Sequence, residues 1–262
     1  MLLFPPDKLR ACVSLANKLH TEAIEPANGK LQIMMILMSP PGAPLSPGFI
    51  IFYDGPEEEA RSLAKPVFDL DPIMAMGGMT SYAKCTVTPP GMALPGFDRH
   101  AASSAHMDYP IDEDLVLDIF ARYSQTKEKY GSQIQPSVCV LDLRDYRKVA
   151  SVPADATAYS ARYNTALVVP SFLWQDPKLD QTMRSEASAL TTYIREKLRE
   201  AGVKAGVQAD GQRDVTAIYA NVSGGAEKSK SVFGSNLPRL QALKKRYDPN
   251  LMWDKWYPIT PA

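Results

Sequence analysis

The segment from Leu31 to Met38 constrains the fold of this chain more than any other. Its sequence is LQIMMILM, and apolar side chains stand at almost every position. A strand with one solvent-exposed face alternates apolar and polar residues, whereas an unbroken apolar run is typical of a strand that is covered on both faces. We therefore expect a sheet in which this segment is a central strand covered on both sides.

The turn and helix signals around this segment predict an α+β fold with antiparallel neighbours. The loop-forming residues 39–48 lead to a second apolar run, Gly48 to Tyr53, and the acidic residues after Asp54 are typical of a helix start. Pro170 indicates that its strand lies at an edge or carries a bulge. Hydrophobic periodicity predicts further strands at 136–143, 164–174 and 214–222, an extended segment at 99–109, and helices at 5–22, 112–130, 177–201 and 237–247.

Composition narrows the classes of function and the number of domains. The length of 262 residues suits one large domain or two small ones, and we expect a single domain that spans residues 1–262. The 29 basic and 29 acidic residues cancel, so the net charge does not favour nucleic acid or an anionic membrane as a partner.

The N-terminal residues are too polar for a signal peptide and no apolar run has transmembrane length, so we expect a cytoplasmic protein. Cys12, Cys85 and Cys139 lack metal-ligand spacing, which indicates buried reduced thiols and no metal site.

The C-terminal tail, residues 219–262, carries the most specific pattern in the chain. A Tyr-x-Asn sequence is followed by an aromatic-Gly-x-Asn turn, an Arg-Leu pair and Leu-Lys-x-x-Tyr-Asp-Pro. This pattern resembles the C-terminal end of the berberine-bridge-enzyme-like oxidoreductases, within the vanillyl-alcohol-oxidase type of flavoproteins. The matching positions are Tyr219, Asn221, Phe233, Gly234, Asn236, Arg239, Leu240, Leu243, Lys244, Tyr247, Asp248 and Pro249.

The resemblance implies the substrate domain of that family, a large and mainly antiparallel sheet with helices packed on one face and a substrate pocket on the other. In the family, an FAD-binding domain with a Gly-rich pyrophosphate loop precedes this domain. No such loop follows a predicted strand here, so the expected cofactor is none, with FAD as the alternative if a partner supplies its site. A sheet face without that domain would be exposed, so we expect a homodimer or a partner subunit to cover it.

Two sources supply the candidate catalytic residues. The resemblance places Tyr219 and Asn221 near the flavin and the substrate. It also places Asn236 against the flavin if FAD is present, although Asn236 alternatively caps the helix at 237–247. The extended segment at 99–109 adds His106 and Asp108, an imidazole and a carboxylate close enough to cooperate as acid and base.

Apolar and aromatic residues supply the candidate substrate contacts. Met76 and Tyr82 lie in an irregular, Met-rich segment around residues 71–96, and flexible thioethers beside loop formers can line an adaptable apolar pocket. Tyr163 and Trp174 flank the strand at 164–174 and are candidates for a pocket wall. All four side chains are also consistent with ordinary packing in the core.

The sequence supports three hypotheses about function. The first is an enzyme without a cofactor that catalyses a non-redox cyclisation or isomerisation of a small apolar metabolite, with Tyr219, Asn221, His106 and Asp108 as the polar groups that orient and polarise it. The second is a truncated or split FAD-dependent oxidoreductase. The third is a non-catalytic protein that binds a metabolite.

Overall fold

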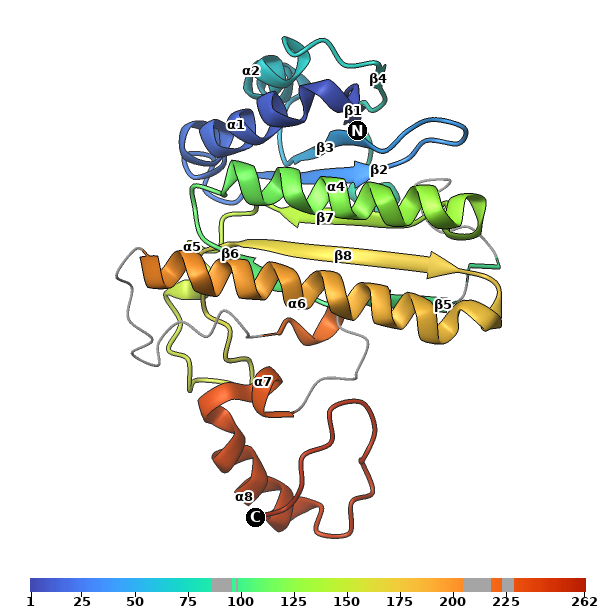
Figure 1. The fold of residues 1–262 in the computed structure, drawn as a ribbon. Coiled ribbons are helices and arrows are strands. Elements are labelled where there is room, and N and C mark those ends of the chain that lie inside the picture. Colours follow the sequence, from blue (N-terminus) through green and yellow to red (C-terminus); the bar gives the residue numbers. More distant parts are fainter. Residues whose placement is uncertain (86–95, 98, 205–217, 223–228) are drawn as a thin grey trace.

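The chain folds into one antiparallel sheet with a layer of helices on one face (Figure 1). This computed structural model describes residues 1–85, 96–97, 99–204, 218–222 and 229–262. Within these residues the sheet has eight strands, and each pairing between neighbours is antiparallel. The α+β class predicted from the order of the elements is confirmed.

The strands follow the order β4-β1-β3-β2-β7-β8-β5 across the sheet, and β6 pairs with β8 next to β5. Their bounds are β1 Leu2–Leu3, β2 Leu31–Met38, β3 Ser46–Tyr53, β4 Met74–Ala75, β5 Arg99–Ala102, β6 Ala105–Met107, β7 Val138–Asp142 and β8 Ala166–Trp174. β2 lies between β3 and β7 and pairs with both. The prediction that this segment is a central strand is therefore confirmed.

Helices α1, α4 and α6 cover one face of the sheet, and α7 and α8 lie beyond its β5 edge (Figure 1). The α-helices are α1 Leu9–Leu19, α2 Glu57–Phe68, α3 Tyr82–Cys85, α4 Glu113–Tyr130, α5 Arg147–Ala150, α6 Asp180–Lys204, α7 Ser229–Phe233 and α8 Leu237–Tyr247, and a π-helical turn at His20–Ile24 continues α1. Short 3-10 turns lie at Pro6–Lys8, Gly131–Ile134, Pro177–Leu179, Ala220–Val222 and Gly234–Asn236. No helix in the described ranges is both long and apolar enough to cross a bilayer.

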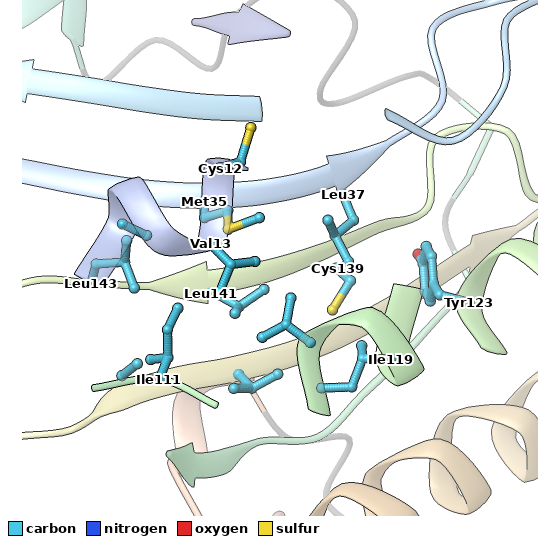
Figure 2. Packing of buried hydrophobic residues seen from close by; sticks show 14 of the residues in the cluster. Cys12, Val13, Met35, Leu37, Ile111, Ile119, Tyr123, Cys139, Leu141 and Leu143 are labelled. Atoms are coloured by element: carbon cyan, nitrogen blue, oxygen red, sulfur yellow. The ribbon is translucent and has the colours of Figure 1, made fainter. Parts of the chain in front are cut away.

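The main core lies between the sheet and this helix layer. Ile33, Met35 and Leu37 alternate along β2 toward the helices and are at most 1% exposed. Tyr123 of α4 stacks on Phe172 of β8 with ring centroids 5.0 Å apart. Figure 2 shows side chains from α1, β2, β7 and α4 meeting in this layer.

The opposite face of the sheet is covered only in part. Of the residues that β2 directs to that face, Gln32 is exposed, Met34 and Met38 are half-buried, and Ile36 is buried. A small separate cluster on this face consists of Ala102, Leu167 and Val169, with Val140, Tyr219 and Val222 packed against it. The expectation that β2 is covered on both sides therefore holds fully on the helix side and partly on the other.

Three predicted elements differ from the structure. The extended segment at 99–109 is divided into β5 and β6, and the interruption at Ser103–Ser104 lies opposite Val169–Pro170 of β8. β8 itself has strands on both sides and is not an edge strand, so the irregularity that Pro170 indicated appears in its neighbours. The strand predicted at 214–222 is wrong at its C-terminal end, where Ala220–Val222 form a 3-10 turn, and residues 214–217 lie outside the described residues.

The three cysteines do not share one environment. Cys12 and Cys139 are buried, as predicted, but Cys85 is exposed at the end of α3. Burial raises the pKa of the Cys12 and Cys139 thiols to about 12, because the thiolate would lose its hydration. Both buried thiols therefore stay protonated at neutral pH and have the low reactivity of structural cysteines.

A buried lysine gives the fold a testable response to alkaline pH. Lys127 of α4 is 6% exposed, and its Nζ donates to the carbonyl oxygens of Ile134 at 3.0 Å and Gln135 at 2.7 Å. Burial lowers the pKa of Lys127 from 10.5 to about 8. Between these two pH values the folded protein has released the proton and the unfolded chain still holds it, so folding becomes more favourable as the pH rises.

We therefore expect the wild type to gain stability relative to a Lys127→Met variant as the pH rises from about 8 to 10.5, the range between the two pKa values. The relative gain should be roughly 1–2 kcal/mol, since water screens part of the cost of burying the charge. Urea unfolding of both proteins across this range measures the difference. A difference that stays constant with pH would contradict the expectation.

Candidate functional site

Two cavities are candidates for a functional site. The larger has a volume of about 550 Å³ and lies beside β1 and β3, between α2 and residues 75–85. The smaller has a volume of about 340 Å³ and lies where β7 ends and β8 begins, on the face opposite the helix layer. We call the smaller cavity the tyrosine pocket; it is lined by His106, Arg144, Tyr146, Val149, Tyr159, Arg162, Tyr163, Thr165, Leu167 and Tyr219.

A buried ion pair at the end of β7 positions one wall of the tyrosine pocket. The Asp142 side chain is 5% exposed, and its two oxygens accept hydrogen bonds from Arg144 Nε at 2.8 and 2.7 Å and a further one from Arg144 Nη2. Tyr146 donates its hydroxyl to the same carboxylate at 3.1 Å. Hydrogen bonding to Asp142 raises the pKa of the Arg144 guanidinium, so the arginine is held charged and in a fixed orientation.

Tyr219 forms a second wall and is held from three directions. Its backbone N–H donates to Ser104 Oγ at 3.0 Å, and its ring packs edge-to-face on Tyr159 with centroids 6.0 Å apart. Asn221 Nδ2 donates to the Tyr219 hydroxyl oxygen at 3.0 Å. Since that oxygen already accepts from the amide, the phenol proton remains available for a ligand that accepts it.

The remaining polar side chains lie between these two walls. His106 is 9% exposed, its Nδ1 lies 2.9 Å from Thr165 Oγ1, and the Tyr163 ring packs against it at 5.3 Å. The Arg162 guanidinium lies 5.0 Å above the centroid of the Tyr159 ring and donates through Nη2 to Thr157 Oγ1 at 2.7 Å. The pocket therefore combines aromatic faces with hydrogen-bond donors and two guanidinium groups.

The phenols of this pocket stay protonated at neutral pH. Burial is the main cause that raises the pKa of both Tyr146 and Tyr159 above the ordinary value for tyrosine. A neutral phenol donates a hydrogen bond and presents an apolar ring face. The arrangement can bind a flat, unsaturated molecule and hold its oxygen atoms.

Comparison with known proteins connects this pocket to a family. The family described as "Berberine and berberine like" matches residues 218–254, which include Tyr219. The chain is 52% identical over 265 residues to the "FAD-linked oxidoreductase pgmH" of Aspergillus terreus, and the match covers 100% of this chain and 54% of that protein. The chain is homologous to berberine-like FAD-linked oxidoreductases. The resemblance seen in the C-terminal tail is thereby confirmed.

Solved structures of berberine-like proteins share the fold. The crystal structure of aclacinomycin oxidoreductase has a TM-score of 0.64 at 20% identity, with 97% of this chain and 53% of that chain covered. A berberine-bridge-enzyme-like protein of Arabidopsis thaliana has a TM-score of 0.63 at 14% identity, with 100% and 56% covered. The large antiparallel sheet implied by the resemblance is confirmed, and the chain spans about half the length of the curated relatives it matches.

The structure brings together some of the predicted catalytic residues. Tyr219 and His106 both line the tyrosine pocket, although they come from distant parts of the chain. Asn221 is exposed and does not line it, but it orients Tyr219 through the hydrogen bond to the hydroxyl. Asp108 is exposed beyond the end of β6 and is not among the lining residues of either cavity, and its cooperation with His106 as acid and base stays a prediction.

The predicted substrate contacts fall in three different places. Tyr163 lines the tyrosine pocket, whereas Met76 and Tyr82 line the larger cavity, where Met79 joins them. A role for that cavity in binding substrate stays a prediction. Trp174 lines neither cavity, because it is fully buried on the helix side of β8 and donates from Nε1 to Asp180 Oδ1 at 2.7 Å. The prediction that Trp174 forms a pocket wall is therefore corrected.

Sequence reasoning missed five of the polar lining residues, namely Arg144, Tyr146, Tyr159, Arg162 and Thr165. Four of them are arginines and tyrosines in the connection between β7 and β8, where the sequence reads DLRDY and AYSARYN. Interleaved arginine and tyrosine in a loop next to a buried strand was the available signal. Periodicity does not detect it, because these residues lie outside regular elements.

Asn236 holds a loop of the tyrosine pocket in place, and the flavin contact implied by the berberine-like pattern stays a prediction. Asn236 is 7% exposed, and its Nδ2 donates to the carbonyl oxygens of Ala154 at 2.7 Å and Thr157 at 3.0 Å. It makes no side-chain cap on α8, so the prediction that it caps this helix is wrong. The amide fastens the loop before Tyr159. Within the described ranges, no three His, Cys, Asp or Glu side chains gather as metal ligands.

Proposed function

We propose that this chain supplies the substrate-binding half of an FAD-linked oxidoreductase. The observation that carries the proposal is the tyrosine pocket, which lies on the sheet face opposite the helices and contains Tyr219 from the berberine-like segment. A concave site with aromatic walls and a few convergent polar groups is the usual form of a small-molecule site. The identity of 52% to a protein named as an FAD-linked oxidoreductase extends along the whole chain, which favours redox chemistry over the other hypotheses.

The residues of this chain would bind and orient the substrate. Bound FAD would supply the redox chemistry, as an acceptor of two electrons from the substrate. The edge-to-face pair of Tyr159 and Tyr219 offers ring faces to a flat substrate, and the Tyr219 hydroxyl offers a proton to one of its oxygens. Arg144 is held in a fixed orientation by Asp142 and presents its planar guanidinium beside these rings. Such fixed donors lower the barrier by orientation and by stabilising charge that develops in the transition state.

The half-covered face of the sheet is the surface we propose for the flavin-binding half. Met34 of β2 and Val140 of β7 are half-buried on this face, and the tyrosine pocket opens beside them. Apolar side chains at the centre of a sheet are normally covered, so a partner surface is expected there. The homodimer predicted from the sequence remains a second way of covering the same face.

Two other hypotheses remain as predictions. A non-redox cyclisation or isomerisation would use the same orienting groups without FAD, and a non-catalytic protein would use the pocket for binding alone. No contact between the described residues favours either of these hypotheses over that of the oxidoreductase. The substrate in the first hypothesis was a small apolar metabolite, but the tyrosine pocket is lined by more polar residues than that hypothesis assumed.

A chimaera tests the proposal directly. This chain would replace the matching part of the Aspergillus terreus relative, and the purified chimaera and the intact relative would be desalted and their visible absorbance recorded. We expect the chimaera to retain the flavin band, because the chain would complete the wall that encloses the cofactor. A soluble, folded chimaera without flavin, beside an intact relative that keeps it, would contradict the proposal and favour the non-redox hypothesis.

A further inference from the structure

We propose that the tyrosine pocket recognises an anionic, flat aromatic substrate, a carboxylate or an acidic phenol, and that Arg162 binds its charge. This inference rests on the proposed function, because it names the class of substrate for the same site. It also revises the small apolar metabolite expected from the sequence. Three observations carry it: the charge of the lining, the surroundings of Arg162 and the arrangement of the tyrosines.

The lining of the pocket carries positive charge without a matching carboxylate. Arg144 and Arg162 are its two permanently charged residues, and no Asp or Glu is among the lining residues. Asp142 beneath the wall neutralises Arg144 through several hydrogen bonds. Arg162 makes no ion pair with any described residue, and the partner of its Nη2 is the neutral hydroxyl of Thr157. One uncompensated positive charge therefore faces the cavity.

The surroundings of Arg162 favour an interaction with a bound anion over hydration by bulk water. Its Nε is buried and has no hydrogen-bond partner within the described part of the chain. The guanidinium also lies over the Tyr159 ring at 5.0 Å, which keeps it in the pocket. A partly desolvated cation with an unused donor gains most from an anion, because charge-assisted hydrogen bonds are stronger than neutral ones and a planar fork matches two oxygens.

The tyrosines determine the shape of the ligand. Tyr146, Tyr159, Tyr163 and Tyr219 all line the cavity. Tyr159 and Tyr163 lie in the connection that leads into β8, and the Tyr219 backbone is fastened to Ser104 between β5 and β6. Their ring faces favour a flat scaffold, since aromatic groups pack edge-to-face or offset-stacked at such distances. The Tyr219 proton is left available by the hydrogen bond from Asn221, so it can be donated to a second oxygen of the anion. A volume of about 340 Å³ admits a small fused-ring acid.

Calorimetric titration of the full chain with naphthoate and with naphthamide tests this inference. The two probes share a ring system, and they differ in the charge of the group that Arg162 would bind. We expect naphthoate to bind about tenfold tighter than naphthamide, and the preference to shrink as salt is added. The Arg162→Gln variant should lose the preference, because glutamine keeps a hydrogen-bond donor and removes the charge.

A matched variant controls for loss of an arginine stacked on a tyrosine. Arg122 lies 3.7 Å above the Tyr193 ring on the helix side, away from the pocket, so Arg122→Gln should leave the preference unchanged. If thermal unfolding shows that Arg162→Gln is not folded, Arg162→Lys replaces it. The lysine keeps the charge but not the planar fork, so the preference for naphthoate over naphthamide should become weaker without being lost. Equal binding of both probes to the wild type, or a preference that survives in Arg162→Gln, would overturn the inference. Retention of flavin by the chimaera is independent of this result and reports on the proposed function alone.

Discussion

Replacing Trp174 with alanine is expected to lower the free energy of unfolding by about 3–5 kcal/mol. The indole is fully buried in the main core, so its removal leaves a cavity that neighbouring side chains fill only in part. It also removes the hydrogen bond from Nε1 to Asp180 Oδ1, which fastens the first turn of α6 to the end of β8. Urea unfolding followed by far-ultraviolet circular dichroism measures the change.

An exposed tryptophan provides the matched control. Trp253 is 73% exposed in the C-terminal segment, and its contacts with Lys244 and Asp248 are made by its backbone atoms, which alanine retains. Trp253→Ala should therefore change the free energy of unfolding by less than about 0.5 kcal/mol. If Trp174→Ala were as mild as this control, and instead weakened ligand binding, the placement of Trp174 in the core would be wrong and the pocket wall predicted from the sequence would be right.

Replacing Asp142 with alanine is expected to cost about 2–3 kcal/mol, the second largest effect. The carboxylate is the common acceptor for Arg144 and Tyr146, and its removal leaves both donors without that partner at the edge of the core. The estimate lies below the full cost of breaking a buried pair, because the Arg144 side chain is 43% exposed and water can reach it. Chemical denaturation of the variant measures the loss.

A second pair in the same loop has the same spacing and a similar exposure, so it separates the part of Asp142 in the pocket wall from the effect of an ion pair alone. Asp145 pairs with Arg147, also two residues apart, and their side chains are 10% and 47% exposed. Asp145 accepts hydrogen bonds from Arg147, whereas Asp142 joins both Arg144 and Tyr146, and Asp145 is not among the residues that line the tyrosine pocket. We therefore expect Asp145→Ala to cost about 1 kcal/mol or less and to leave the binding of naphthoate unchanged. Equal losses from the two variants would show that the Asp142 pair has no special part in holding the pocket wall.

The regular elements were the part of the fold that local sequence determined well. The helix expected at 112–130 is α4, since Asp112 caps it and apolar residues recur at helical spacing down to Tyr130. The strand expected at 164–174 is β8, where alternation of side chains is hidden because nearly all positions are buried. Both predictions rest on interactions between residues close in the chain, which is why the sequence alone reveals them.

The tyrosine pocket, in contrast, depends on contacts between residues that lie far apart in the chain. Resemblance identified Tyr219, but the residues that surround it come from β6, from the end of β7 and from the connection into β8, and no local pattern relates them. The same limit explains the wrong capping role: Asn236 looked like a helix cap, and only the folded chain shows its amide on the carbonyls of Ala154 and Thr157.

The sequence by itself therefore determined the α+β class, the central position of Leu31–Met38 and the kinship of the C-terminal tail, because apolar periodicity and short motifs are properties of neighbouring residues. The tertiary structure alone decided that Tyr219 and His106 share a pocket with Arg162, and that Trp174 does not. Contacts between residues far apart in the chain depend on strand order and register. A shift of one residue in register would turn His106 of β6 and Trp174 of β8 to the other face of the sheet.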